Sequence, residues 1–423
     1  MTRDNKLLRL WPHRLVPTRW LLVAGLAVAV RLAVLLLAPS GLAVDTDGYL
    51  TLADHLNEYG VYGTGTEPTA YRPPLYVLLL SVVRWLPLTA PVAIGTLHLA
   101  LGLLTIYVVF RLARDRHSGI AALVAPILVT LDPILLHHSA QVMSETLATC
   151  CAALCLACLT RADRQGSLLV MALAGAMLGV SSLCRPNFLA WLIMVAAYLV
   201  WTSTRREEQW PWIIALVGAC GLALAPWALR NALLLDRPVI TTTHGGYTFL
   251  LGNNPSFYTY LRKRDWGESW NPNGIIPSRD RALGELDYDR ACYQRAWRSI
   301  QDEPGMAAWS ALVKAGRLWS PLPYRRSVDE SIASRVARYA TAGWYSIVFA
   351  LAIWGVWSQR LCIGKSPWVW VVLMCLAWTA VHAFYWSNLR MRAPLVPGLA
   401  LLAAAGVASL LISWKNISQR HPV

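Results

Sequence analysis

Carboxylates lie where two apolar runs of the chain meet polar sequence, and they are its first candidates for chemistry. Asp45 and Asp47 flank one residue after the first apolar run, and Glu145 stands at the start of a later one. A carboxylate within about 2.6–3.2 Å of a hydroxyl can remove its proton, and paired carboxylates can hold a hard cation. We therefore expect a general base or a metal site. Solvated loop acids, or a helix N-terminus formed by Ser144 and Glu145, are the structural alternatives.

A set of arginines recurs in the polar links beside apolar runs: Arg72, Arg185, Arg230, Arg390 and Arg392. Guanidinium matches phosphate with paired donors and keeps its charge close to lipid. The set therefore predicts a phosphate cradle, although anchoring to lipid headgroups would use the same residues equally well. Asn253, in a Gly- and Asn-rich stretch, could line the same polar site or form a turn.

The composition is that of a membrane protein. Of 423 residues, 56% are hydrophobic and 14% charged, and apolar runs of about 17–21 residues match the length that crosses ~30 Å of hydrocarbon. The 21 Trp fit aromatic belts at the membrane interfaces. The formal charge of +15 resides mostly in short links, where it sets orientation, so we exclude a nucleic-acid partner. The nine Cys show no metal or disulfide spacing.

The apolar runs predict an all-α polytopic membrane protein with about ten transmembrane helices. They cover residues 20–38, 92–112, 119–137, 145–160, 167–183, 187–203, 211–229, 340–357, 367–385 and 394–413. The run at about 73–88 is short, opens with two prolines and contains Arg84, so we interpret it as an interfacial helix. Most cations of the later links then fall on the inner side, as the positive-inside rule requires. Both termini are cytoplasmic and the acidic loop is extracytoplasmic in this topology.

Three segments organise the chain in this interpretation. Residues 1–229 form a membrane module of seven spans, whose first outer loop, 39–91, carries the acids. Residues 230–338 form an extracytoplasmic hydrophilic block, and residues 339–423 hold three further transmembrane helices.

The hydrophilic block divides in two by composition. Residues 279–319 carry Ala, Leu, Tyr and Trp at near-helical spacing and predict one or two helices broken near Pro304. Residues 252–278, with Gly, Asn and Pro throughout, predict irregular loop.

Several short motifs, in order along the chain, resemble the membrane glycosyltransferases of the GT-C class. The resemblance is to the branch that contains protein O-mannosyltransferases and lipid A aminoarabinose transferases. The motifs are Asp45 four residues before Tyr49, Leu52-Ala53, Tyr71-Arg72-Pro73-Pro74-Leu75-Tyr76, Ser144-Glu145-Thr146-Leu147, Cys184-Arg185-Pro186, Pro226-Trp227 to Arg230-Asn231, Gly252-Asn253-Asn254-Pro255 and Arg390-Met391-Arg392-Ala393-Pro394. The family's acid pair is adjacent, whereas Thr46 separates Asp45 from Asp47 here, so the choice of base between them stays open.

The resemblance implies an inverting transfer of a sugar from a polyprenyl-phosphate donor to an acceptor on the extracytoplasmic side of the plasma (inner) membrane. It implies that one of the two aspartates is the base and that Glu145 positions the acceptor or holds a metal. The arginine set, with Tyr49 and Asn253, would bind substrate. The sugar, the acceptor and the need for a divalent metal stay open, and the sequence requires no other cofactor.

A polytopic lipid or glycolipid transporter or flippase is the main alternative. Transporters favour ionisable groups near mid-membrane and paired broken helices in internal repeats. Here the ionisable groups gather at one face, and the sequence shows no repeat. A non-catalytic lipid-binding protein would have the same features, so sugar transfer by the purified chain is the discriminating observation.

Overall fold

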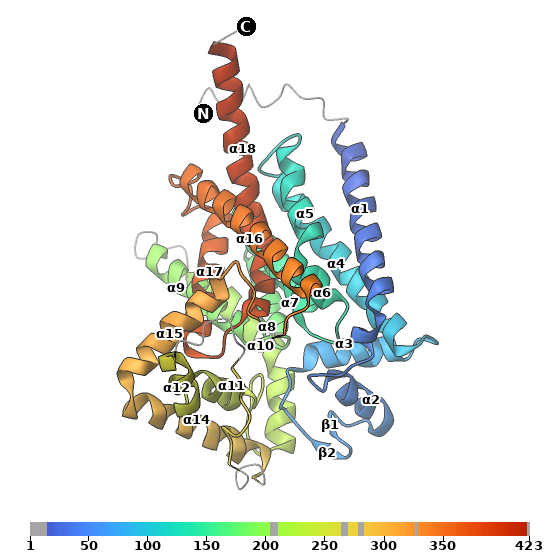
Figure 1. Cartoon of the computed structure of the whole chain (residues 1–423), viewed down its shortest axis with the longest axis vertical. Coiled ribbons are helices and arrows are strands. Elements are labelled where there is room, and N and C mark those ends of the chain that lie inside the picture. The colour runs from blue at the N-terminus through green and yellow to red at the C-terminus, as the bar shows by residue number, and fades with distance from the viewer. Residues whose placement is uncertain (1–14, 204–209, 264–269, 278–282, 326–328, 421–423) are drawn as a thin grey trace.

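The computed structural model describes residues 15–203, 210–263, 270–277, 283–325 and 329–420. Long helices form a bundle, and shorter elements gather at its lower end in Figure 1. The elements are α1 (Leu15–Leu37), η3 (Pro39–Leu42), α2 (Tyr49–Tyr59), β1 (Gly63–Thr64), β2 (Glu67–Pro68), α3 (Pro74–Arg84), α4 (Ala90–Arg114), α5 (Ala121–Leu131), α6 (Pro133–Ser139), α7 (Glu145–Gln165), α8 (Leu168–Ser182), α9 (Asn187–Ser203), α10 (Trp210–Leu234), α11 (Gly245–Gly252), α12 (Pro255–Lys263), α14 (Glu285–Asp302), α15 (Pro304–Trp319), α16 (Ile332–Ser358), α17 (Trp368–Phe384), η5 (Leu389–Leu395) and α18 (Val396–Arg420). The prediction of an all-helical polytopic protein is confirmed, apart from the two-residue antiparallel strands β1 and β2.

Six helices among the described residues are long and apolar enough to cross a membrane: α1, α4, α7, α10, α16 and the stretch Leu389–Trp414 that contains α18. Helices α5 and α6 together make a seventh candidate, bent by 46° at their junction. Three further predicted spans are the shorter apolar helices α8, α9 and α17, with 15, 17 and 17 residues. Each of the ten predicted segments therefore coincides with an apolar helix or bent pair, and six to seven have full crossing length.

The segment interpreted as interfacial forms α3, whose 11 residues span about 16 Å. A helix of that length does not cross ~30 Å of hydrocarbon. It packs instead on α2, where Arg84 Nε donates to Asp54 Oδ1 at 2.9 Å and Asn57 exchanges hydrogen bonds with Ser81. Residues 49–84 thus form a folded layer of α2, the β1–β2 hairpin and α3.

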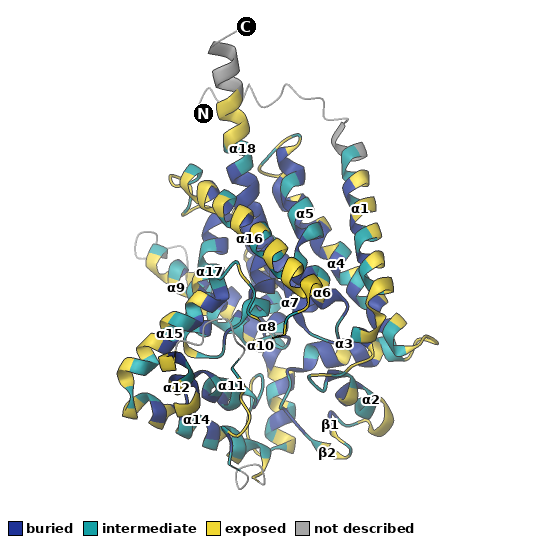
Figure 2. Cartoon of the chain, in the orientation of Figure 1, coloured by how far each residue is buried: buried dark blue, intermediate teal, exposed yellow. Residues whose placement is uncertain are grey.

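Helix α7 lies at the centre of the bundle, as the dark core of Figure 2 shows. In its most apolar stretch 78% of the residues are buried, compared with 17% in that of α1. Its sequence is rich in Ala, Thr and Cys, and small side chains allow neighbouring helices to approach closely in a membrane. Cys151 and Cys155 are buried free thiols there and pack as small side chains.

The hydrophilic block contains α11, α12, α14 and α15, and the helix break predicted near Pro304 is confirmed. The prediction of irregular loop over 252–278 is wrong for α12. That helix forms because the Asn254 side chain accepts the Phe257 backbone N–H at 2.8 Å, which caps its first turn. Residues 264–269 and 278 lie outside the described part of the chain.

Close backbone contact joins α16 to α18. A Cβ at Gly355 would lie 1.9 Å from the Leu402 carbonyl oxygen, and one at Gly406 would lie 2.2 Å from that of Leu351. Backbone atoms at a helix interface cannot move aside as a flexible side chain can. These glycines therefore set the distance between the two helices.

We predict that Gly355→Val lowers the free energy of unfolding by at least about 1–3 kcal/mol, because overpacking forces the helices apart. Thermal unfolding of the purified protein in detergent measures the effect. Gly343→Val is the matched control on the same helix, since a Cβ there meets no atom within 4 Å. Equal destabilisation by the two variants would mean that helix propensity, and not the α16–α18 contact, explains the loss.

Candidate active site

Carboxylates and guanidinium groups alternate in a cluster built from four links of the chain. Asp47 Oδ1 lies 3.2 Å from Arg72 Nη2, and Asp47 Oδ2 lies 3.6 Å from Arg390 Nη1. Glu145 Oε1 lies 3.6 Å from Arg390 Nε and 2.7 Å from Arg185 Nη2. The charged groups therefore follow one another in the order Arg72, Asp47, Arg390, Glu145 and Arg185. We call these five residues the charge cluster. Five residues predicted from the sequence thus converge.

The inner end of the charge cluster is sealed from solvent and its outer end is open. The Glu145 side chain is 0% exposed, whereas those of Asp47 and Arg390 are 21% and 30% exposed. A buried carboxylate costs much free energy unless positive groups compensate it. Ser144 does not cap α7 with its side chain; its hydroxyl accepts from Arg185 Nε at 3.3 Å.

Asp45 is held differently from Asp47. Its Oδ2 accepts the backbone N–H and the hydroxyl of Thr51, both at 2.8 Å, which ties it to the first turn of α2. Its Oδ1 is buried and has no hydrogen-bond partner among the described residues. Gly48, with φ of 75°, makes the reversal between the acids and α2, a conformation that favours glycine. Neutral donors therefore orient Asp45 and leave one oxygen unused.

Aromatic groups surround Arg72. Its guanidinium carbon lies 5.3 Å from the centre of the Tyr49 ring and 5.4 Å from that of Tyr71. Burial raises the pKa of Tyr49, against the lowering effect of Arg72 and Arg185, so its hydroxyl is neutral at pH 7. Burial, with Arg72 and Arg390, lowers the pKa of His244 to about 3. The site therefore gathers positive charge on arginines alone.

Two of the predicted binding residues lie outside the charge cluster and bind backbone. Arg230 donates to the carbonyl oxygens of Thr69 and Tyr62 at 2.8 and 2.7 Å. Arg392 is fully buried, donates to the carbonyl oxygens of Leu318 and Ser320 at 3.0 Å, and stacks on Tyr345. Both guanidinium groups therefore hold neighbouring links of the chain in place.

Asn253 also lies outside the charge cluster. Its amide nitrogen donates to the Phe384 carbonyl oxygen at 2.8 Å, and its Oδ1 accepts from Lys314 at 3.2 Å. Lys314 is fully buried and donates further to the carbonyl oxygens of Gly252 and Phe384 at 3.0 Å. Burial, with Arg317, lowers the pKa of Lys314 to about 7.

Glu285 is a positioning residue that the sequence did not reveal. From the start of α14 its carboxylate accepts the Ala70 N–H at 2.9 Å, the Thr243 hydroxyl at 2.6 Å and the Thr69 hydroxyl. These contacts fix the strand that leads to Arg72. The partners are 42 or more residues away in sequence, so no local pattern signals the role.

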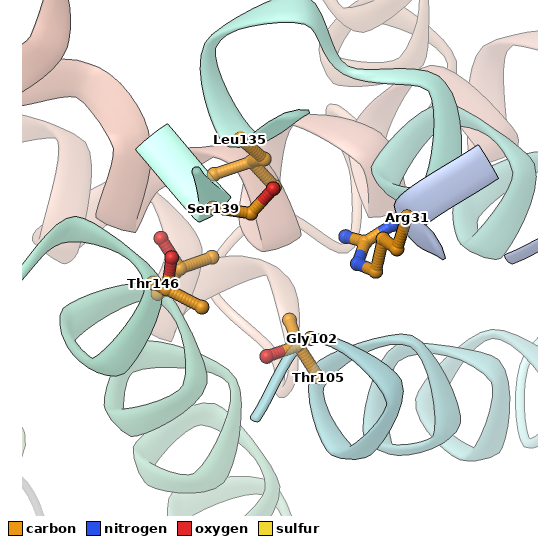
Figure 3. Close-up of a pocket in the computed structure, with 7 residues that line it drawn as sticks. Arg31, Gly102, Thr105, Leu135, Ser139 and Thr146 are labelled. Carbon is orange, nitrogen blue, oxygen red and sulfur yellow. The ribbon is translucent and has the colours of Figure 1, made fainter. Parts of the chain in front are cut away.

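A small cavity lies between α1, α4, α6 and α7 and is lined by residues from each of these helices (Figure 3). Arg31 of α1 points into it and donates to the Thr130 carbonyl oxygen at 3.2 Å. Ser139 of α6 and Thr146 of α7 line the other side. Its volume of about 10 Å³ suits roughly one water molecule. Arg31 therefore pairs with a polar neighbour inside the bundle.

The carboxylates do not assemble a metal site by themselves. Across the described residues, no three His, Cys, Asp or Glu side chains converge as ligands would. Arg390 occupies the position between Asp47 and Glu145, so a guanidinium bridges the two acids.

The fold is similar to that of archaeal oligosaccharyltransferases of known structure. The chain superposes on the oligosaccharyltransferase AglB of Archaeoglobus fulgidus, solved with an inhibitory peptide and a dolichol-phosphate, with a TM-score of 0.54 and 13% identity over 95% of this chain and 52% of that one. An Archaeoglobus fulgidus oligosaccharyltransferase tethered to an acceptor peptide gives a TM-score of 0.55 and 11% identity over 95% of this chain and 51% of that one. This chain thus spans about half the length of the archaeal enzyme. ArnT of Cupriavidus metallidurans, bound to undecaprenyl phosphate, gives a TM-score of 0.42 and 16% identity over 93% of this chain and 78% of that one.

Part of the sequence matches a family model. Residues 71–229 match the family model described as dolichyl-phosphate-mannose-protein mannosyltransferase. A comparison with curated proteins gave no match. The resemblance found from motifs is therefore confirmed, and the chain is a multi-pass membrane protein similar to this GT-C family.

We predict that Arg185→Gln lowers the free energy of unfolding by about 3 kcal/mol, because Glu145 then keeps a buried charge with only Arg390 beside it. Adding Glu145→Gln should restore part of that loss, since no charge is left buried without its partner. Thermal unfolding of the single and double variants measures the coupling.

The matched control is Arg164→Gln, which breaks an ion pair with Asp115 at exposed positions. Exposed pairs contribute only about 0–1 kcal/mol. A double variant as unstable as the sum of its single variants would contradict the coupling between Arg185 and Glu145.

Proposed function

We propose that the chain is an inverting glycosyltransferase that moves a sugar from a polyprenyl-phosphate donor to an acceptor hydroxyl on the extracytoplasmic side. The observation that carries the proposal is the charge cluster, in which three arginines meet two carboxylates, one of them two residues from Asp45 in the sequence. The match of residues 71–229 and the fold shared with an enzyme solved with dolichol-phosphate support the same donor class.

Asp45 is the base in this proposal. Its free Oδ1 accepts the proton of the acceptor hydroxyl as the hydroxyl oxygen attacks the anomeric carbon. The bond from that carbon to the phosphate oxygen breaks, and its electron pair stays with the polyprenyl phosphate. Both oxygens of Asp47 face guanidinium groups, which compete for the lone pairs a base must offer.

Arg72 and Arg390 are the phosphate ligands in this proposal, since both reach the open end of the charge cluster. Arg72 Nε is buried without a hydrogen-bond partner among the described residues, and Arg390 is 30% exposed. Donors aimed at developing charge are worth about 3–4 kcal/mol each. Asp47 and Glu145 position these arginines, and Arg185 balances Glu145.

The topology completes the proposal. Residues 1–229 form the catalytic membrane module, 230–338 the extracytoplasmic block and 339–423 the last three spans of a ten-span plasma-membrane protein with cytoplasmic termini. In Figure 1, α1 begins and α18 ends at the upper end, and the block and the first outer loop lie at the lower end. That separation supports a single extracytoplasmic face for the reaction.

We predict that Asp45→Asn lowers kcat by about 10²–10⁴-fold, because Asn cannot accept the proton. Its side-chain oxygen can still accept from Thr51, so folding and donor binding persist. The assay measures transfer of labelled sugar from a panel of polyprenyl-phosphate hexoses and pentoses, in membranes that contain the purified protein and native acceptors.

Asp47→Asn is the paired control and should chiefly raise KM for the donor, since it loosens Arg72 and Arg390. Near-normal turnover in Asp45→Asn together with an inactive Asp47→Asn would exchange the two roles. A wild-type protein that moves the lipid across vesicles but transfers no sugar would support the transporter alternative instead.

We also predict that an introduced thiol at Glu67, an exposed hairpin position, reacts with a membrane-impermeant maleimide in intact cells. Cys362, the exposed cysteine of the α16–α17 link, should react only after the membrane is opened. Labelling of both from the same side would overturn the proposed topology.

A further inference from the structure

A large cavity lies at the end of the bundle opposite the charge cluster. It has a volume of about 650 Å³ and lies between the α4–α5 link, the α16–α17 link and the middle turns of α18. Arg390 precedes α18, and Leu411, in the cavity wall, lies about 22 Å along the axis from the first residue of that helix. The cavity is therefore separate from the proposed active site.

The polar side of this cavity carries positive charge and unused hydrogen-bonding groups. Arg116 and Lys365 line it, and no carboxylate from the described part of the chain does. Arg116 Nη2 donates to the Ser366 carbonyl oxygen, and Lys365 forms no ion pair with a described residue. Ser366 is 5% exposed, and its hydroxyl, like His117 Nε2, is buried without a partner among the described residues.

The charges around these groups favour an anion. Of the nearby acids, Asp115 pairs with Arg164, and Asp163 lies outside the lining of the cavity. Burial, with Arg116, lowers the pKa of His117 to about 4, so its ring is neutral at pH 7 and can donate or accept a hydrogen bond. A phosphate would satisfy two cations and the two unused polar groups together.

The other wall of the cavity is apolar and continues to the lipid-facing surface. Ala405, Ala408, Leu411 and Ile412 of α18 form it, and the last two are 43% and 52% exposed. Trp414, 75% exposed, follows at the position of an interfacial aromatic residue. The volume is within the roughly 300–1,000 Å³ of small-molecule sites. Such a wall suits an acyl chain.

We propose that this cavity binds an anionic phospholipid of the leaflet next to the chain termini. The phosphate lies between Arg116, Lys365, the Ser366 hydroxyl and His117, and an acyl chain follows the apolar face of α18. Basic pockets between membrane helices bind lipid headgroups in this way. The bound lipid joins the α4–α5 link, the α16–α17 link and α18.

Cys362 provides the probe, since it lines the cavity and is the exposed one among the nine cysteines. The full chain in phosphatidylcholine nanodiscs is alkylated with a maleimide while the mole fraction of phosphatidylglycerol is raised. Peptide mass spectrometry gives the alkylation rate at Cys362, and the lipid fraction that halves this rate gives the affinity. We expect phosphatidylglycerol to protect Cys362.

Arg116→Gln with Lys365→Gln should raise the half-protecting lipid fraction about thirtyfold, from the contribution of two cations near a membrane. Lys365→Gln alone, which breaks no bond to a described residue, should raise it about fivefold and guards against misfolding of the double variant. Arg111→Gln with Arg360→Gln is the control of equal charge outside the lining, and it should leave protection unchanged.

Three results would overturn the proposal. Equal protection of Cys362 in pure phosphatidylcholine would mean that the lipid acyl chains alone protect it and that the headgroup charge has no role. Equal loss of protection in the Arg111 and Arg360 variant would mean nonspecific attraction. Protection by inorganic phosphate alone, at matched ionic strength, would make the ligand a soluble phosphate.

Discussion

The burial of the Glu145 carboxylate constrains the rest of the site. A charge at the mouth of a central helix, with no exposed surface, is stable only if cations from other elements reach it. Arg185 comes from the α8–α9 link and Arg390 from η5, so these two links must close over the start of α7. Arg390 then reaches Asp47, which in turn reaches Arg72. One buried acid thereby fixes the relative positions of four segments that are distant in sequence.

The segments that carry the charge cluster keep their positions because the helices that support them are closely packed. Gly175 of α8 contacts the backbone of α10, where a Cβ would lie 2.0 Å from the Leu216 carbonyl oxygen, and Gly355 does the same between α16 and α18. Close approach of backbones lets short helices such as α8 pack along their whole length. Beside this scaffold, Arg230, Asn253 and Arg392 donate hydrogen bonds to backbone carbonyl oxygens of other links. These hydrogen bonds hold the links around the charge cluster in place.

The sequence predicts what depends on local pattern. Apolar runs give the ten helical segments, two prolines and a short length give the interfacial α3, and Pro304 separates α14 from α15. The sequence does not predict α12, because a side-chain cap from Asn254 stabilises a helix in a segment whose composition is typical of loops. Nor does it separate Arg390 from Arg392: two residues apart, one faces Glu145 and the other Leu318. Glu285 has no local signal, since its role exists only once α14 packs on the first outer loop.

The proposed reaction moves negative charge in the direction that this arrangement favours. Before transfer, Asp45 carries one negative charge and the phosphodiester donor another; afterwards Asp45 is neutral and the polyprenyl phosphate carries both. The total charge is unchanged, but one unit moves from an oxygen held by neutral Thr51 donors toward Arg72 and Arg390. Three guanidinium groups against two carboxylates leave the charge cluster one positive charge in excess, which attracts the phosphate more strongly as the bond breaks. Asp47 cannot replace Asp45 without losing this advantage. Protonation of Asp47 would break its ion pairs with Arg72 and Arg390, and these two arginines would no longer be held in position for the phosphate.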